Sequence, residues 1–328
     1  MLTNKINIDG ERRERVFAFL DKVGVQYEIA EHPPIFSQAD REFHDVQIDA
    51  MIFKNLFLRN KDKSRYYLYS LPIIKQANLA ALAKALGDTR LSFGGEDALQ
   101  EKLNIRRGAV SFLNVIEANA DDVTLLIDSS AFFFDKIGVH PNDNTATVIL
   151  KPSDIHRLLN ACGADCRFIA LDDGEIFIEK ATDNDIADIL RLQYATYQSE
   201  AIIYNDFSIQ PLTQTPEQEA AAFRENVVLK AVQDGRIIGS VRAYEKSGVA
   251  YIGKLMVLPG YQNRGLGKRL LQSIEGEFPG GKFELYTGSK SEKNLAFYEN
   301  NGYVRFKTAE AAPGLTLVYL EKLPRLAT

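Results

Sequence analysis

The sequence predicts a protein of two α+β domains. At 328 residues the chain is long for a single hydrophobic core, so two domains are the natural expectation. Strand and helix patterns alternate irregularly in the first half, which favours a mixed sheet. Residues 171–175 are polar and turn-forming and make the best boundary, so we place the domains at residues 1–172 and 173–328.

Composition narrows the class of protein. Hydrophobic residues make up 45% and charged residues 25% of the chain, which is ordinary for a soluble globular protein. No apolar run approaches the roughly 18 residues of a membrane span, and the N-terminus has no apolar signal core. Two cysteines, Cys162 and Cys166, make neither a disulfide framework nor a zinc site. We therefore expect a cytoplasmic protein that uses no metal.

The net charge of the chain limits the kinds of nucleic acid that it could bind. The formal net charge of -5 argues against nonspecific wrapping of long nucleic acid, which needs clustered Lys and Arg. It leaves room for a site that takes one nucleotide end.

Periodicity predicts the elements of the first half. Apolar residues at helical spacing indicate helices, and alternating or continuous apolar runs indicate strands. In chain order we expect a helix at 16–23, a strand at 25–29, a short helix at 37–43 capped by Ser37, a hairpin of strands at 48–58 and 65–71, helices at 79–86 and 98–103, a glycine-bearing loop at 107–112 entering a strand, strands at 123–127 and 131–134, a loop and strand within 139–150, and a helix at 153–161 capped by Ser153.

Lys54 interrupts one of these apolar strands. A buried ammonium without a partner is costly, so this side chain must reach an open face or a partner. Two interpretations follow from the spacing: a lysine on the exposed side of an edge strand, or a lysine that serves a site.

Several separated motifs stand out in this half: His32-Pro33-Pro34, residues 54–59, residues 108–111, and His140-Pro141 with Asn144-Thr145. In this order they resemble the YbaK/ProX family, relatives of the prolyl-tRNA synthetase editing domain, and the resemblance covers residues 8–170. It implies a mixed-sheet editing domain that hydrolyses the ester between a tRNA and a mischarged amino acid. The ProX branch is more similar, which implies Ala-tRNA(Pro) as the substrate.

The resemblance also implies site residues. Lys54 would hold the terminal phosphate or the developing oxyanion, and His140 would orient substrate or water. Contacts to the tRNA end and the aminoacyl group would come from Asn55, Gly108, Ser111 and Asn144. An aminoacyl ester is already activated, so positioning and charge stabilisation are the main requirements. A histidine before a proline is otherwise often a loop anchor, and that alternative stays open for His140.

The chain departs from the family at one border of the pocket. Phe112 follows Ser111 where the family usually has proline, and residues 113–119 match loosely. The departure bears on amino-acid selectivity more than on fold. It motivates an alternative, in which the first half is a non-hydrolytic module that binds an amino acid or a tRNA end.

The second half is organised around residues 255–271. An apolar run up to Leu258 predicts a buried strand, and apolar residues from Leu270 to Ile274 predict a helix. The loop 262–267 between them carries two glycines and opens the helix. The first N–H groups of a helix have no internal partner and lie at the positive end of its dipole, so this loop suits a phosphate. A surface loop without function is the alternative.

The rest of this half completes a sheet with helices. We expect a strand at 176–178, a helix that follows Thr182, a long irregular segment at 198–215, a hairpin of strands at 227–233 and 237–244, a central strand at 249–258, and a helix and strand around 294–303.

These features resemble the GNAT N-acetyltransferase family. Residues 262–267 fit its pyrophosphate loop, Gln/Arg-x-x-Gly-x-Gly/Ala, and residues 294–303 resemble its last helix and the strand after it. The resemblance covers the chain from Ile176 on. It implies an acyl-CoA N-acyltransferase fold with a mixed, mostly antiparallel sheet, acetyl-CoA as co-substrate, and a small-molecule or peptide amine as acceptor.

The second resemblance likewise implies roles for residues. Tyr298 would be the catalytic acid that reprotonates the thiolate, although a tyrosine that packs on the sheet is an alternative. No general base is identifiable, and Glu200, Tyr204 and Glu245 are candidates. The cofactor-binding residues would be Leu255, Met256 and Val257 at the thioester, Gln262, Asn263, Arg264, Gly265, Leu266, Gly267 and Lys268 at the pyrophosphate, and Asn294 at the pantetheine arm.

Overall fold

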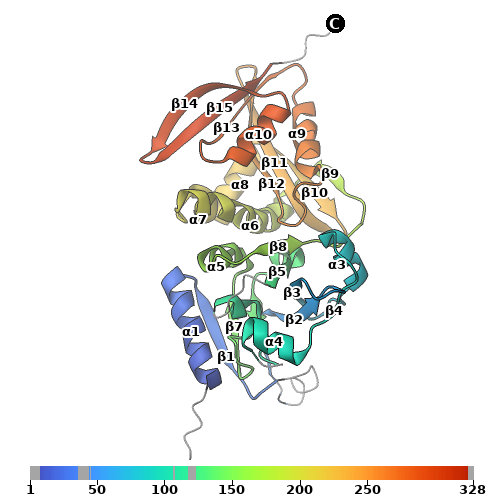
Figure 1. Cartoon of the computed structure of the whole chain (residues 1–328). Helices are drawn as coiled ribbons and strands as arrows, with labels where there is room; N and C mark the ends of the chain where they lie inside the picture. The colour runs from blue at the N-terminus through green and yellow to red at the C-terminus, as the bar shows by residue number, and fades with distance from the viewer. Residues whose placement is uncertain (1–7, 36–43, 45, 106–107, 117–122, 324–328) are drawn as a thin grey trace, which may run out of the picture. The chain divides into compact units, whose positions relative to one another are not determined.

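The computed structural model describes residues 8–35, 44, 46–105, 108–116 and 123–323. The chain forms two compact units, Met1–Asp172 and Asp173–Thr328 (Figure 1). We call them the N-terminal and the C-terminal unit. Among the described residues no helix combines the length and the apolar character needed to cross a membrane.

The N-terminal unit is built on a mixed sheet, as predicted. The strand order is β1-β7-β6-β2-β3-β5-β8, with β4 paired to β2. The pairs β2–β6, β3–β5 and β5–β8 are parallel and the others are antiparallel. The strands are β1 (Tyr27–Glu31), β2 (Met51–Arg59), β3 (Tyr66–Pro72), β4 (Ser92–Phe93), β5 (Val123–Asp128), β6 (Ile137–Val139), β7 (Ala146–Leu150) and β8 (Cys166–Ile169).

Helices cover both faces of this sheet. The α-helices are α1 (Ile8–Val23), α3 (Leu79–Leu86), α4 (Glu96–Leu103) and α5 (Ile155–Cys162), and the 3-10 helices are η1 (Phe112–Ile116), η3 (Ser129–Phe133) and η4 (Pro152–Asp154). Buried side chains of α1, α4 and α5 join one hydrophobic core, and those of α3 join a second core with β3. β3 is buried almost throughout, as expected of a strand covered on both faces.

Three local predictions for this unit are wrong, and one lies outside the described residues. The expected strand at 131–134 is part of η3, because the Asp128 carboxylate accepts a hydrogen bond from the Ser130 N–H at 3.0 Å and starts a turn there. The loop at 107–112 leads into η1 instead of a strand. Ser153 lies inside η4, and α5 starts only at Ile155. The helix expected at 37–43 falls on residues outside the described ranges.

The C-terminal unit has a seven-stranded sheet in the order β14-β15-β13-β12-β11-β10-β9. Only β12 and β13 pair in parallel, which confirms the mixed, mostly antiparallel sheet. The strands are β9 (Phe177–Lys180), β10 (Val227–Gln233), β11 (Arg236–Lys246), β12 (Val249–Val257), β13 (Lys282–Gly288), β14 (Val304–Ala312) and β15 (Leu315–Lys322).

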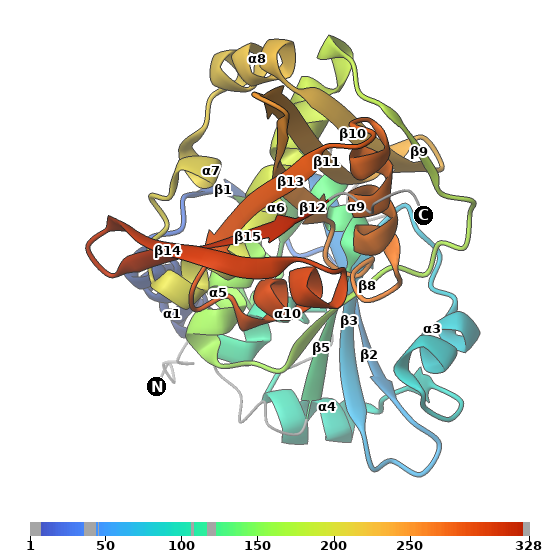
Figure 2. The same ribbon diagram turned by 90° about the horizontal axis from the view of Figure 1, so that it is seen from above.

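Helices lie on both faces of β11 and β12. The helices are η5 (Asp183–Asp185), α6 (Ile186–Tyr204), α7 (Gln210–Thr213), α8 (Pro216–Glu225), α9 (Leu266–Gly276) and α10 (Glu292–Asn300). α9 packs on β10, β11 and β12 (Figure 2), and α6 packs on the opposite face of β11 and β12. A helix follows Thr182, as expected, and starts with a capping box of Thr182 and Asp185. The prediction of an irregular segment at 198–215 is wrong, since α6 continues to Tyr204 and α7 follows.

Candidate functional site

In the N-terminal unit a gap in the sheet opens a cavity. β2 pairs with β6 only at Met51 and Ile52, and with β4 only at Leu58 and Arg59. Within the described ranges, the edge of β2 between these pairs therefore lacks a strand partner, and it borders a cavity of about 650 Å³. The Gly94 N–H closes one end of the gap by donating to the Phe57 carbonyl at 2.9 Å.

The cavity brings together four of the residues predicted for this site: Lys54, Asn55, Gly108 and His140. The Lys54 ammonium donates to the Ile73 carbonyl at 3.2 Å. One neutral carbonyl is a weaker partner for an ammonium than an anion is, so a phosphate or an oxyanion would compete well for it. Lys54 thus lines the cavity, and its service to a site there stays a prediction.

The other polar residues of the cavity are held by their neighbours. The Nδ1–H of His140 donates to the Ala146 carbonyl at 3.0 Å, which fixes the orientation of the ring. The Asn55 side-chain oxygen accepts from the Ser70 hydroxyl. Gly108 has φ of +96°, a conformation that glycine adopts readily, and its main chain forms part of the wall.

Ser111 and Asn144 do not line the cavity. Ser111 is fully buried, its N–H donates to the Asn114 side-chain oxygen at 2.7 Å, and its hydroxyl accepts from the Leu113 N–H. These contacts start η1 and leave the hydroxyl facing the protein. The Asn144 carbonyl accepts from the Ile35 N–H at 3.2 Å. A direct contact of these two side chains with substrate remains a prediction.

In the C-terminal unit two neighbouring strands diverge. β12 pairs with β13 only from Val249 to Tyr251, so the main-chain groups of β12 beyond Tyr251 have no partner on that side. A cavity of about 400 Å³ fills the wedge and is lined by both strands, α6, α10 and the turn between β14 and β15. Predicted residues in its wall are Leu255, Met256, Val257, Gln262, Asn294 and Tyr298.

The glycine-bearing loop leads from this wedge into α9. Gly265 is the N-cap with φ of +81° and has open space where a side chain would start. The Arg269 N–H donates to the Gly265 carbonyl at 3.1 Å, so the N–H groups of the residues between them precede the helical ladder. Asn263, Arg264 and Lys268 are exposed beside this helix start. The loop thus has the uncovered amides and positive charge that an anion needs.

Tyr298 lies in α10 within reach of the wedge. Burial raises the pKa of its hydroxyl and the Glu200 carboxylate adds to the effect, so the phenol stays protonated and is able to donate. Glu200 accepts hydrogen bonds from Ser291 at 2.5 Å and from Asn294 at 2.9 Å, which fixes the start of α10 against α6. The Tyr204 hydroxyl accepts from the Lys290 N–H.

Two of the candidate bases differ in position. Glu200 lines the cavity, whereas Glu245 is exposed near the end of β11 and does not. The hydrogen bonds of Glu200 to Ser291 and Asn294 occupy both of its oxygens, so it acts first as a structural link.

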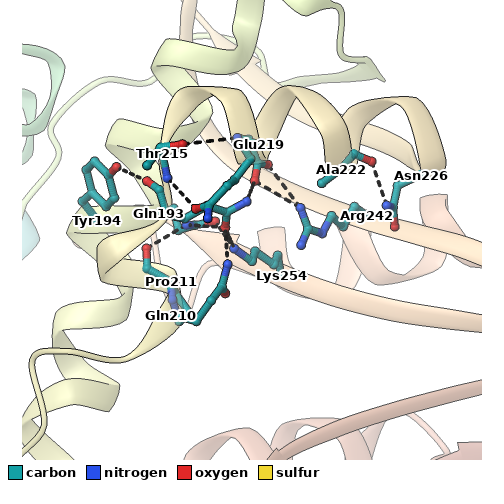
Figure 3. A network of polar contacts seen from close by, with 12 residues as sticks. Gln193, Tyr194, Gln210, Pro211, Thr215, Glu219, Ala222, Asn226, Arg242 and Lys254 are labelled. Carbon is teal, nitrogen blue, oxygen red and sulfur yellow. Dashed lines mark hydrogen bonds and ion pairs between the residues drawn. The ribbon is translucent and has the colours of Figure 1, made fainter.

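The sequence interpretation missed Lys254, which lines the same cavity. It has φ of +49° where β12 bulges against β11. Its ammonium donates to the side-chain oxygens of Gln193, at 2.6 Å, and Gln214 (Figure 3). Burial lowers the pKa of Lys254 to about 8, and nearby Arg242 adds to the effect. The available signal was a lysine inside an apolar strand, as for Lys54.

A buried polar network extends from Lys254. The Gln214 amide donates to the Glu219 carboxylate at 2.5 Å, and Glu219 forms an ion pair with Arg242 at 3.2 Å (Figure 3). Gln193 also donates to the Pro211 carbonyl at 2.7 Å. The network therefore ties α6, α7 and α8 to the two central strands beneath the wedge.

Comparison with known proteins gives separate matches for the two units. Residues 37–158 match the family model of the aminoacyl-tRNA editing domain, and residues 186–303 match that of the acetyltransferase (GNAT) family.

Curated relatives match the N-terminal half. The prolyl-tRNA editing protein ProX of Acetoanaerobium sticklandii is 33% identical over 164 residues, which is 50% of this chain and 100% of that protein. Prolyl-tRNA synthetase associated domain-containing protein 1 of Mus musculus is 32% identical over 160 residues, 47% of this chain and 94% of that protein.

Solved structures similar to the chain include acetyltransferases. The PaiA N-acetyltransferase of Thermoplasma acidophilum, in complex with coenzyme A, has 19% identity and a TM-score of 0.36, covering 45% of this chain and 99% of that one. The ribosomal-protein-S18-alanine N-acetyltransferase of Escherichia coli has 15% identity and a TM-score of 0.38, covering 47% and 97%.

Proposed function

Because the chain belongs to the aminoacyl-tRNA editing domain family through its N-terminal unit, and its C-terminal unit is a GNAT acetyltransferase domain, we propose that it is a bifunctional enzyme. The N-terminal unit hydrolyses a mischarged aminoacyl-tRNA, with Ala-tRNA(Pro) as the proposed substrate. The C-terminal unit transfers an acetyl group from acetyl-CoA to an amine.

The gap at the edge of β2 supports the hydrolysis. An aminoacyl ester that enters the cavity meets the Lys54 ammonium, whose one hydrogen-bond partner among the described residues is the Ile73 carbonyl. Water adds to the ester carbonyl, negative charge develops on its oxygen, and Lys54 stabilises that charge. The C–O bond to the ribose then breaks, and the ribose oxygen leaves as a hydroxyl with the proton that the attacking water gives up. The proposed role of His140, whose ring is held by the Ala146 carbonyl, is to orient the water.

The wedge between β12 and β13 supports the acetyl transfer and is the observation that carries this half of the proposal. The main-chain groups of β12 beyond Tyr251, which have no β13 partner among the described residues, suit an elongated thioester. Gln262 in the cavity wall belongs to the loop that leads to the start of α9, which suits a diphosphate. The amine attacks the thioester carbonyl, the C–S bond breaks, and protonated Tyr298 donates its proton to the departing sulfur. The new amide nitrogen loses its extra proton to solvent, and Tyr298 takes a proton back from solvent.

Hydrolysis of Ala-tRNA(Pro) by the wild type, Lys54→Ala and Lys84→Ala proteins tests the N-terminal assignment. Lys84 is an exposed lysine of α3 outside the cavity and serves as the matched control. We expect Lys54→Ala to lose most of the activity and Lys84→Ala to keep it. Background-level release of alanine by all three proteins would instead favour a non-hydrolytic binding module, an alternative consistent with Ser111 lying outside the cavity wall.

A screen for coenzyme A release tests the C-terminal assignment and identifies the acceptor. The panel holds amino acids, polyamines, peptide amines and aminoacyl-tRNAs, each with acetyl-CoA. Acetylation of the aminoacyl group on tRNA would link both units through one substrate. No binding of acetyl-CoA by calorimetry would refute the assignment.

A further inference from the structure

The N-terminal unit has a second cavity, of about 520 Å³, that the proposed hydrolysis does not use. Four cationic side chains line it, and none of the described residues in its wall is acidic. The hydroxyls of Ser64 and Thr124 and the ring of Tyr66 complete its polar surface. The cations come from three separate segments of the chain: Lys63 and Arg65 from one, Lys102 from the second and Arg167 from the third.

Neighbouring acids neutralise these cations only in part. Arg65 lies 3.7 Å from Asp88, and Lys102 lies 3.2 Å from Glu101. Lys63 and Arg167 are exposed, and neither forms an ion pair within the described part of the chain. In a chain of formal net charge -5, this wall concentrates positive charge in one place.

The second cavity lies next to the first. Phe57 lines the first, Tyr66 lines the second, and their rings stack with centroids 5.5 Å apart. Helix α4 also borders both, with Glu96 at the first cavity and Lys102 at the second. At about 1.5 Å of rise per residue these two positions are about 9 Å apart along the helix. That distance corresponds to about three nucleotides of a helical strand, at about 3.4 Å each.

We infer that this cavity binds backbone phosphates of the same tRNA acceptor strand whose aminoacyl end enters the first cavity. The inference rests on the proposed hydrolytic function and adds a positioning site to it. Guanidinium groups form paired hydrogen bonds with phosphate, lysines supply further charge, and phosphate contacts fix register without reading sequence. The cavity thus gives an acidic protein a local means of holding RNA.

Binding of uncharged tRNA(Pro) tests the inference separately from hydrolysis. The site variant is Lys63→Ala/Arg167→Ala, chosen because both side chains are exposed and form no ion pair with any residue that the structure describes. The charge-matched control is Lys22→Ala/Lys151→Ala, two exposed lysines that line neither cavity. Affinities are measured over a series of salt concentrations. The site variant should bind several-fold more weakly, and its slope of log K against log salt should fall by about two.

The control should bind like the wild type. Wild-type affinity in the site variant, or an equal loss in both variants, would overturn the inference. The difference between wild type and site variant should appear with an acceptor-stem minihelix and vanish with adenosine monophosphate, a single nucleotide that is too short to span both cavities. A loss of the same size with the mononucleotide would also count against it.

The outcomes separate this inference from the proposed function. Binding that depends on Lys63 and Arg167, without any hydrolysis, would support the phosphate site and refute the deacylase. Hydrolysis of Ala-tRNA(Pro) by the wild type, together with wild-type affinity of the site variant for tRNA, would support the deacylase and refute the phosphate site. Inorganic pyrophosphate that binds the wild type but not the site variant, with tRNA binding unchanged, would assign the cavity to a small phosphorylated ligand and overturn the inference.

Discussion

Replacing Lys254 with methionine should change how the stability of the protein depends on pH. Burial lowers the pKa of Lys254 from 10.5 to about 8, nearby Arg242 contributes in the same direction, and Glu219 opposes both. The folded state therefore disfavours the charged lysine. Methionine has a similar length and no charge, so the variant removes this ionisation and retains much of the packing.

The size of the effect follows from the shift. A fall in pKa from 10.5 to about 8 corresponds to about 3 kcal/mol at about 1.4 kcal/mol per unit, and partial exposure of the side chain reduces this to about 2 kcal/mol. Below pH 8 the lysine is charged in both the folded and the unfolded state, and its burial destabilises the fold. Between pH 8 and 10.5 the unfolded state binds more protons, so the stability contributed by Lys254 rises with pH.

Urea unfolding from about pH 7 to about pH 10 measures this contribution. The chain has no tryptophan, so circular dichroism is the better signal. The free energy of unfolding of the wild type should rise by about 1–2 kcal/mol relative to Lys254→Met over this range. Burial raises the pKa of tyrosines such as Tyr298. Because these tyrosines are present in both proteins, their contribution to the pH dependence cancels in the difference between wild type and variant. Lys246→Met, at an exposed lysine of β11, should show a flat difference. A flat or falling difference for Lys254→Met would refute the reasoning.

Three further predictions concern the C-terminal unit. Tyr298→Phe should lower kcat for acetyl transfer by about 10²–10⁴-fold with little change in the KM for acetyl-CoA, and a wild-type kcat would assign proton donation to another group. Gly265→Val should weaken acetyl-CoA binding about tenfold in calorimetry, because valine is strained at φ of +81°. The control Gly276→Ala, at the other end of α9 with open space around it, should bind acetyl-CoA normally. Equal losses of affinity in both variants would contradict the loop assignment. Glu219→Gln should lower the pKa of Lys254 further, measured from the pH dependence of lysine labelling, and a rise would contradict the network.

Much of the fold could be predicted from the sequence, because the signals are local. Helix α3 ends at Gly87, which has φ of +63°, as expected of a helix stopped by glycine. The hairpin of β10 and β11 turns at Asp234 and Gly235, both at positive φ. The hydrophobic spacing of α9 and the glycine before it likewise depend on neighbouring residues alone.

Local signals failed where side chains interact beyond their own segment or compete with the backbone. The apolar residues at 131–134 suit a strand, but the Asp128 carboxylate binds the following N–H groups and starts a 3-10 turn instead. The sequence pattern predicts an irregular segment from residue 198, where α6 in fact continues. Glu200 of α6 accepts hydrogen bonds from Ser291 and Asn294, and these contacts stabilise the end of α6.

The sequence by itself determined the two domains, most of their helices and strands, and the families through motifs that lie in order along the chain. Tertiary structure alone decided which residues share a site. Whether β2 lacks a partner beside Lys54, whether Ser111 faces inward, and whether Lys254 lies among glutamines depend on strand pairing and packing. The basic cavity is the clearest case, because its cations come from three segments that are far apart in the sequence and meet only once the sheet has formed. The spacing of residues within one segment carries no information about which other segments will lie beside it in the folded protein.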